Sequence, residues 1–187
     1  MSAPARVQHL FDVREYQRMV EAGVFEPGAR VELVAGEILD ISPQSSRHAT
    51  AVRLVEEALR EAFDITRRPF DVRVQLPMSL GADSEPEPDI AVVDGGPRDY
   101  ANAHPRSARL IVEVSDTSID FDRGRKRRLY AGHDISEYWI LDLGARRLEI
   151  HRDPRGDRYA ETLLLGPQDE ARPEGGTSPV LVADLLP

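Results

Sequence analysis

The amino-acid sequence predicts an α/β or α+β domain with a central mixed sheet flanked by helices. Runs rich in apolar residues, typical of strands, occupy residues 71–80, 89–94 and 109–115. The last of them shows almost no alternation of apolar and polar residues, which is expected when both faces of a strand are covered. A helical pattern and a further apolar run follow, and a strand–helix–strand order of this length implies a right-handed crossover within the sheet.

The composition is that of one globular domain, because 187 residues with 41% hydrophobic and 30% charged side chains can bury a sizeable core. No apolar run approaches the roughly 20 residues of a membrane span. The chain lacks cysteine, and its first residues do not resemble a secretory signal. We therefore expect no membrane crossing and a cytoplasmic location.

The formal net charge of −9 argues against coating of nucleic acid by bulk attraction, since duplex binding is mainly neutralisation of phosphates by Lys and Arg. Any contact with DNA needs a local basic patch. One such cluster, RGRKRR, lies at residues 123–128. The alternative for this run is a solvated helix face.

The N-terminal part predicts a helix and a hairpin. The helix is expected over residues 10–22, because Asp12 can cap it, Glu15 stands in capping-box register and Gly23 supplies a stop. The hairpin is expected over residues 30–42, where two β-rich arms surround an Ala-Gly pair.

Further elements follow in the order expected of one continuous core over residues 30–153. An amphipathic helix is predicted at 45–63, a helix with Ser and Asp caps at 117–132, and strands at 137–143 and 147–153. Residues 154–187 form a C-terminal extension with further strands, so that residues 1–187 are expected to form a single domain. The apolar stretches 137–143 and 178–187 are candidate contact surfaces for a dimer.

Glu113 is the most informative residue, because it interrupts an otherwise apolar strand. An unpaired buried carboxylate costs several kcal/mol or becomes neutral, so a partner must compensate it. Strand parity places Glu113 with Ile111 and Ser115 on one face, opposite Val112 and Val114. The partner is either an arginine in a salt bridge or a metal ion.

Asp89 opens a neighbouring strand, 24 residues before Glu113, which suffices for two strands and a loop. Two carboxylates at adjacent strand positions could share one Mg²⁺, an ion held by one or two carboxylates together with water and substrate phosphate. The alternative for Asp89 is a solvated loop acid or a turn cap. Asp83, Glu85 and Glu87 of the preceding loop are expected to be solvated.

Lys126 is the only lysine beside 23 arginines, since the chain has 24 basic residues. A lysine is not interchangeable with arginine where a proton or a nucleophilic water is handled. Asp122, Lys126 and Tyr130 recur at intervals of four residues, so this helix face can turn toward the sheet while Arg123 and Arg127 face outward. The alternative is a surface lysine paired with Asp122.

These residues carry a resemblance to a known family. The resemblance begins with PEPDIAVV at 86–93. It is most specific in four motifs that follow one another over residues 88–142: P-D, V-E-V, D-R-G-x-K-x-x-x-Y and E-Y-W-I-L-D. The sequence resembles the Uma-type family of restriction endonucleases, a branch of the PD-(D/E)XK nuclease superfamily. The resemblance also covers FDVREYQRMVEAGVF and RVELVAGEILDISPQSSRHA, and so most of the chain.

The resemblance implies a restriction-endonuclease-like core of α-β-β-β-α-β order, frequent homodimers and a catalytic set. Asp89 is then the acid of the PD motif and Glu113 the (D/E). Ser115 occupies the usual lysine position, and Lys126 on the following helix supplies the amine. Glu32 corresponds to a recurrent glutamate and joins the acidic cluster as a further metal ligand.

The implied activity is Mg²⁺- or Mn²⁺-dependent hydrolysis of DNA phosphodiester bonds, in which a bound cation activates water. Arg123, Arg125, Arg127 and Arg128 are candidate contacts to the DNA backbone, and Tyr130 and His48 are candidate substrate contacts. For His48 the alternative is a helix-capping or core histidine. His133 stands in GHDIS at 132–136, where the family has a Gly-Val/Ile-Pro type turn, and its role stays open.

Two other functions fit the same residues. One is a catalytically silent module that binds nucleic acid or protein, in which Glu113 and Lys126 merely form a buried ion pair. The other is a metal-dependent enzyme that acts on a small phosphorylated substrate, which suits the acidic composition. Metal dependence separates the silent module from both enzymes.

Overall fold

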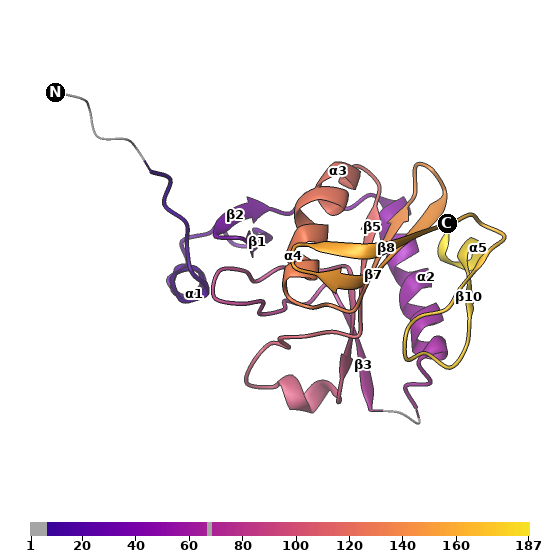
Figure 1. Ribbon diagram of the computed structural model, residues 1–187. Helices are drawn as coiled ribbons and strands as arrows, with labels where there is room; N and C mark the ends of the chain where they lie inside the picture. Colours follow the sequence, from indigo (N-terminus) through magenta and orange to yellow (C-terminus); the bar gives the residue numbers. More distant parts are fainter. Residues whose placement is uncertain (1–6, 67–68) are drawn as a thin grey trace.

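The computed structural model describes residues 7–66 and 69–187 and contains one six-stranded sheet with helices on both faces (Figure 1). The strand order follows the chain, from β3 to β8. β5 and β6 are parallel and the other neighbours are antiparallel, so the predicted mixed sheet is confirmed. The strands are β3 (Phe70–Val74), β4 (Ile90–Asp94), β5 (Leu110–Ser115), β6 (Glu137–Asp142), β7 (Arg147–Arg155) and β8 (Arg158–Leu165).

Helix α2 (Ser46–Ala62) covers one face of the sheet and the crossover between β5 and β6 covers the other. The crossover was predicted as one helix but has three parts: α3 (Ile119–Phe121), the π-helical segment η2 (Asp122–Lys126) and α4 (Arg127–Gly132). The order α2, β3, β4, β5, crossover helix, β6 is the expected α-β-β-β-α-β core.

Two apolar clusters separated by the sheet show why β5 lacks alternation. Leu110, Val112 and Val114 pack with α2, whereas Ile111 packs with α4 on the opposite face. The predicted parity of this strand is therefore confirmed. Every residue of β5 is buried, which follows from helices covering both faces.

The N-terminal helix and hairpin project from one end of the sheet (Figure 1). Helix α1 (Val13–Glu21) has the predicted capping box, in which Asp12 accepts from the backbone of Glu15 and the Glu15 side chain accepts from that of Asp12. β1 (Val31–Val34) and β2 (Glu37–Asp40) are joined by Ala35-Gly36, as the sequence indicated. A short 3-10 helix, η1 (Pro97–Tyr100), lies between β4 and β5.

The C-terminal extension adds a small hairpin and a last helical turn, which pack near α2. These elements are β9 (Glu170–Ala171), β10 (Val180–Leu181) and α5 (Val182–Leu185). The suggestion that residues 137–143 supply a dimer surface is wrong, because β6 lies between β5 and β7 and all its residues are buried. Within the described residues no helix is long and apolar enough to cross a membrane.

Candidate active site

Asp89 and Glu113 meet at one end of the β4 and β5 pair. The antiparallel register pairs Ile90 with Val112, so the preceding Asp89 comes beside Glu113, as the spacing predicted. The backbone N–H of Asp89 lies 3.4 Å from Glu113 Oε2, and the backbone N–H of Val114 donates to Asp89 Oδ2 at 2.8 Å. The strand pairing itself therefore holds the two carboxylates together.

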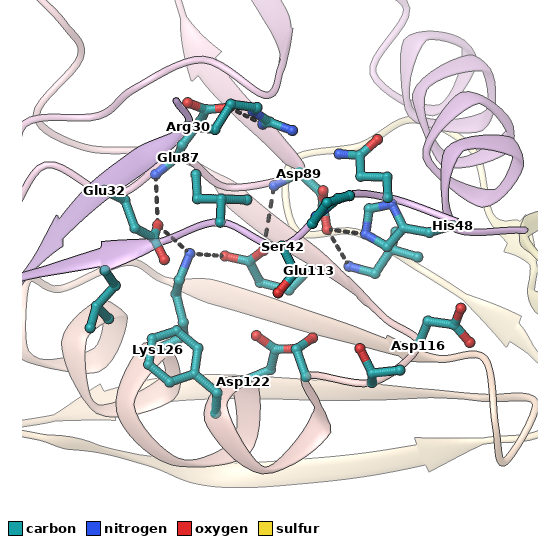
Figure 2. A pocket seen from close by; sticks show the side chains of 18 of the residues that line it. Arg30, Glu32, Ser42, His48, Glu87, Asp89, Glu113, Asp116, Asp122 and Lys126 are labelled. Atoms are coloured by element: carbon teal, nitrogen blue, oxygen red, sulfur yellow. Dashed lines mark hydrogen bonds and ion pairs between the residues drawn. The ribbon is translucent and has the colours of Figure 1, made fainter. Parts of the chain in front are cut away.

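Lys126 joins them from the crossover helix (Figure 2). Its Nζ donates to Glu113 Oε1 at 3.1 Å and to Glu32 Oε2 at 2.8 Å. The lysine and both glutamates are buried, so this is an ion-paired cluster shielded from water. The lysine was expected to face the sheet, and it does, but its partners are Glu32 and Glu113 and not Asp122 as in the surface alternative.

The π-helical segment η2 shapes this face of the crossover. The backbone carbonyl of Asp122 accepts a hydrogen bond from the backbone N–H of Arg127, five residues ahead. This widens the turn that carries Lys126. Asp122, Lys126 and Tyr130 are all buried, as the spacing of four residues indicated. The Tyr130 hydroxyl donates to Glu113 Oε1 at 2.6 Å. Tyr130 therefore contacts Glu113 from within the core and does not line the cavity that is described below.

Burial dominates the electrostatics of the cluster. It raises the pKa of Glu113 to about 8, against the favourable charge of Lys126, and Asp89 raises it further. Burial also opposes the charge of Lys126, but Glu113 and Glu32 outweigh that effect and raise its pKa. Because this centre holds more carboxylates than ammonium groups, an added cation would stabilise it.

His48 contacts the second carboxylate of the site, that of Asp89. Its Nε2 lies 3.2 Å from Asp89 Oδ2, on the first turn of α2 after the capping residue Ser45. Burial raises the pKa of Asp89, but the hydrogen bond and charge of His48 prevail and lower it. Burial likewise opposes protonation of His48, and the contact with Asp89 raises its pKa overall.

Gln75 is a site residue that the sequence did not reveal. Its Nε2 donates to Asp89 Oδ1 at 3.0 Å, and its backbone N–H donates to the carbonyl of Asp89. It directly follows β3 with a positive φ of 51°. No motif marks it, because its position depends on the pairing of β3 with β4.

The loop before β4 was expected to be solvated, and for Glu85 this is wrong. Glu85 is buried, bridges to Leu33 of β1 and accepts a hydrogen bond from Gln17 Nε2 at 2.8 Å. Glu87 binds Arg30, and its backbone N–H donates to Glu32 Oε2 at 3.1 Å. The loop thereby links the hairpin to the sheet and orients Glu32.

A cavity of about 520 Å³ opens over the cluster. The hairpin, the segment that leads into α2, the starts of β4 and of the crossover, and the end of β5 all contribute to its wall. Its charged and ionisable lining is mainly acidic and consists of Arg30, Glu32, Asp40, His48, Glu87, Asp89, Glu113, Asp116, Asp122 and Lys126. Glu32, His48, Asp89, Glu113 and Lys126, all predicted from the sequence, therefore share one cavity.

The arginines of the basic run lie elsewhere. Arg123 was expected to face outward, but its guanidinium binds Glu149 and Asp142 on the sheet. Arg125 donates to Glu37 of the hairpin at 2.8 Å, and half-buried Arg127 lies near enough to His151 for its charge to lower that pKa. None of these three arginines lines the cavity.

His133 ends the crossover helix and is not part of the site. Its backbone forms the C-cap of α4, and its Nδ1 donates to the carbonyl of Leu129 at 2.9 Å. The ring packs against Gly81, where a Cβ would approach His133 Nε2 to 2.7 Å.

The donor set fits a hard divalent cation only in part. Asp89 and Glu113 provide carboxylate oxygens of the kind Mg²⁺ prefers, in a centre that holds more carboxylates than ammonium groups. Across the described part of the chain, however, no three His, Cys, Asp or Glu side chains are spaced to hold a metal ion together. A cation here would be held by Asp89 and Glu113, with water and phosphate as its other ligands.

Comparison with known proteins places the chain in a family. A family profile, Uma2, described as "Putative restriction endonuclease", matches residues 13–182. A crystal structure from Anabaena variabilis, described as a "putative nuclease belonging to DUF820", superposes with a TM-score of 0.73 at 16% identity, over 94% of this chain and 97% of that chain. At this identity the superposition shows a shared fold. No curated protein matches the chain.

Proposed function

The chain belongs to the Uma2 family, and from that premise we propose that it is a metal-dependent endonuclease that hydrolyses DNA phosphodiester bonds. The observation that carries the proposal is the meeting of Asp89, Glu113 and Lys126 at one cavity, although they come from two strands and a helix. Two carboxylates and one amine beside a cavity of about 520 Å³ suit the hydrolysis of a phosphodiester.

In this proposal Asp89 and Glu113 hold Mg²⁺ or Mn²⁺. When bound by these two carboxylates, such an ion would lower the pKa of a coordinated water and offset the charge that develops on the phosphate. Lys126 orients the attacking water or neutralises the scissile phosphate. Glu32 keeps Lys126 in position through its 2.8 Å contact, while His48 and Gln75 fix the carboxylate of Asp89. Within the described residues Glu32 is not spaced to share one ion with Asp89 and Glu113, so its expected role as a metal ligand is wrong.

The expected partners are DNA and a second copy of the chain, and the expected site of action is the cytoplasm. Because β6 is enclosed, residues 137–143 do not supply the dimer surface, and residues 178–187 remain the candidate. Analytical ultracentrifugation of the purified protein tests this expectation through the sedimenting mass.

A second candidate is a silent nucleic-acid- or protein-binding module, and one observation favours it. Lys126 already lies between Glu32 and Glu113 in a buried ion pair, the arrangement that this hypothesis requires. Such a pair is costly to break from either side, so it could hold the fold together without any chemistry.

A cleavage assay separates the two. Supercoiled plasmid, linear duplex and single-stranded DNA are each incubated with the protein and Mn²⁺ or Mg²⁺. The nuclease produces nicked or linear products with either ion and none with EDTA. Asp89→Asn abolishes cleavage, and Lys126→Ala reduces it strongly.

The matched control is Asp94→Asn, at the other end of β4 and exposed. It should cleave like the unmodified protein. Each variant is first checked for an unchanged far-ultraviolet circular dichroism spectrum. Absence of cleavage of all three DNA forms by the unmodified protein would favour the silent module.

A further inference from the structure

The cavity contains few cations that a polyanion could reach. Among its described lining residues, Arg30, His48 and Lys126 carry basic side chains. Lys126 is buried between two glutamates and His48 is held against Asp89. Among these three residues Arg30 is therefore the one whose charge faces solvent, since its side chain is 39% exposed.

Arg30 precedes β1 and binds Glu87 at one side of the cavity (Figure 2). The bond to Glu87 uses NH2 of the guanidinium. A guanidinium has several N–H donors in a planar fork, so a bond to one carboxylate leaves donors that suit a phosphate. Glu87 thus holds Arg30 at the mouth of the cavity.

Arg47 lies next to another side of the cavity, where it contacts the lining residue Asp116 without lining the cavity itself. It lies in the first turn of α2, where NH2 donates to the carbonyl of Leu143 at 2.5 Å and NH1 is 3.7 Å from Asp116 Oδ1. Asp116 lines the cavity, and Figure 2 places it well apart from Arg30, with Glu113 between them. The Arg47 side chain is 43% exposed.

The arginines of the 123–128 run differ in their bonds. Arg123 directs Nε and NH2 to Glu149 and NH2 also to Asp142, so its fork is already occupied by two carboxylates. Arg125 uses NH1 for Glu37, and its NH2 lies 3.5 Å from the carbonyl of Val34. Neither binds a residue that lines the cavity, whereas Arg30 and Arg47 do, so this run is poorly placed to position DNA at Asp89 and Glu113.

We propose that Arg30 and Arg47 bind the phosphates that flank the scissile bond, and so lay one DNA strand across the cavity from the hairpin to the start of α2. This inference rests on the proposed function and names the substrate contacts of the same site. Exposed arginine–carboxylate pairs are weak, so an exchange of partner from Glu87 or Asp116 to phosphate costs little. The buried pairs of Lys126 are costlier to break, so Lys126 is less suited to bind the flanking phosphates.

The test is the salt dependence of DNA binding. A fluorescein-labelled single-stranded oligonucleotide is titrated with the full-length protein in Ca²⁺, over a range of KCl concentrations, by fluorescence anisotropy. Each neutralised phosphate contact contributes about −0.7 to the slope of log affinity against log salt for a single strand. Arg30→Gln and Arg47→Gln should each reduce the slope by about that amount and weaken binding at low salt.

Two sets of variants make the result decisive. Arg30→Lys and Arg47→Lys keep the charge and should keep most of the slope, whereas a merely structural role of arginine would not be rescued. Arg128→Gln, on the exposed side of α4, should leave the slope unchanged.

Unchanged slopes in Arg30→Gln and Arg47→Gln would overturn this inference and leave the nuclease proposal standing, and a lowered slope in Arg128→Gln would assign the contacts to the basic run. If the unmodified protein binds no DNA in either strand form, both proposals fail together. Thermal melts of all variants exclude loss of fold as the cause of a lowered affinity.

Discussion

The ammonium of Lys126, in the π-helical segment of the crossover, lies 3.1 Å from Oε1 of Glu113 on β5. A buried charge without a partner is costly for either group, and Lys126 lowers the pKa of Glu113, although burial still raises it to about 8. The contact therefore serves the stability of the fold and, in the proposed function, the chemistry of the site.

The first prediction concerns this ion pair. Lys126→Met should destabilise the fold by about 3–5 kcal/mol, because Glu113 and Glu32 are left buried without their cation. Adding Glu113→Gln should restore part of the loss, since one of the two carboxyl partners of Lys126 is then neutral. Urea unfolding of the two single variants and the double variant measures the coupling between them.

Lys126→Met with Arg155→Gln is the control pair for this cycle, because Arg155 is exposed and bonds to Asp153 on β7. Their effects should add. Additive effects for Lys126 and Glu113 as well would show that the 3.1 Å contact contributes no coupling.

The second prediction concerns metal binding. Mg²⁺ should raise the thermal midpoint of the protein, because an ion that binds only the folded state stabilises it. Asp89→Asn should abolish the rise and Asp94→Asn should keep it. Differential scanning calorimetry with and without the ion measures the effect, and an equal rise in Asp89→Asn would place the ion elsewhere.

The metal effect should also depend on pH. Burial raises the pKa of Glu113 to about 8, so below this pH a proton competes with the cation for the carboxylate. The Mg²⁺-induced rise in thermal midpoint should therefore be larger at pH 8.5 than at pH 6.5. A rise that is independent of pH in this range would mean that Glu113 does not bind the ion.

The third prediction concerns His151 of β7. Burial lowers the pKa of His151 to about 4, and the positive charges of Arg127 and Arg123 also lower it. Between the unfolded value of about 6.5 and this folded value, the unfolded chain binds more protons than the folded one. Stability should consequently fall as the pH drops from 6.5 to 4, by up to about 3 kcal/mol.

His151→Asn should flatten this acid loss, because an amide can keep the hydrogen bond to Thr162 Oγ1 without taking up a proton. His9→Asn, on the exposed segment before α1, is the control and should leave the acid loss unchanged. Chemical denaturation from pH 4 to 8 measures both. An undiminished loss in His151→Asn would assign it to another group.

The fourth prediction concerns the start of α2. Ser45 Oγ accepts the N–H of His48 at 3.1 Å and donates to Asp116 at 2.8 Å. Ser45→Ala should cost about 1 kcal/mol, the usual loss for a helix N-cap. Ser46→Ala, one residue further, should stay within about 0.5 kcal/mol in urea unfolding. Equal losses in the two variants would contradict the capping role.

Local patterns were sufficient for most elements of the fold. The capping box of Asp12 and Glu15 needs only a few neighbouring residues, and it is present as predicted. The unbroken apolar character of β5 indicated helices on both faces, which the two apolar clusters confirm. The π-helical segment escaped prediction, because its spacing of Asp122 and Lys126 is also compatible with an ordinary helix.

The composition and order of residues by themselves singled out Glu113, Asp89 and Lys126, since a charge in an apolar strand and a solitary lysine are visible without coordinates. Only the tertiary structure decided that Glu32 shares Lys126 with Glu113, that Gln75 binds Asp89, and that Arg123 faces the sheet. These contacts join residues far apart in the chain. Strand register and helix packing determine them, and neither can be inferred from the spacing of residues along one segment.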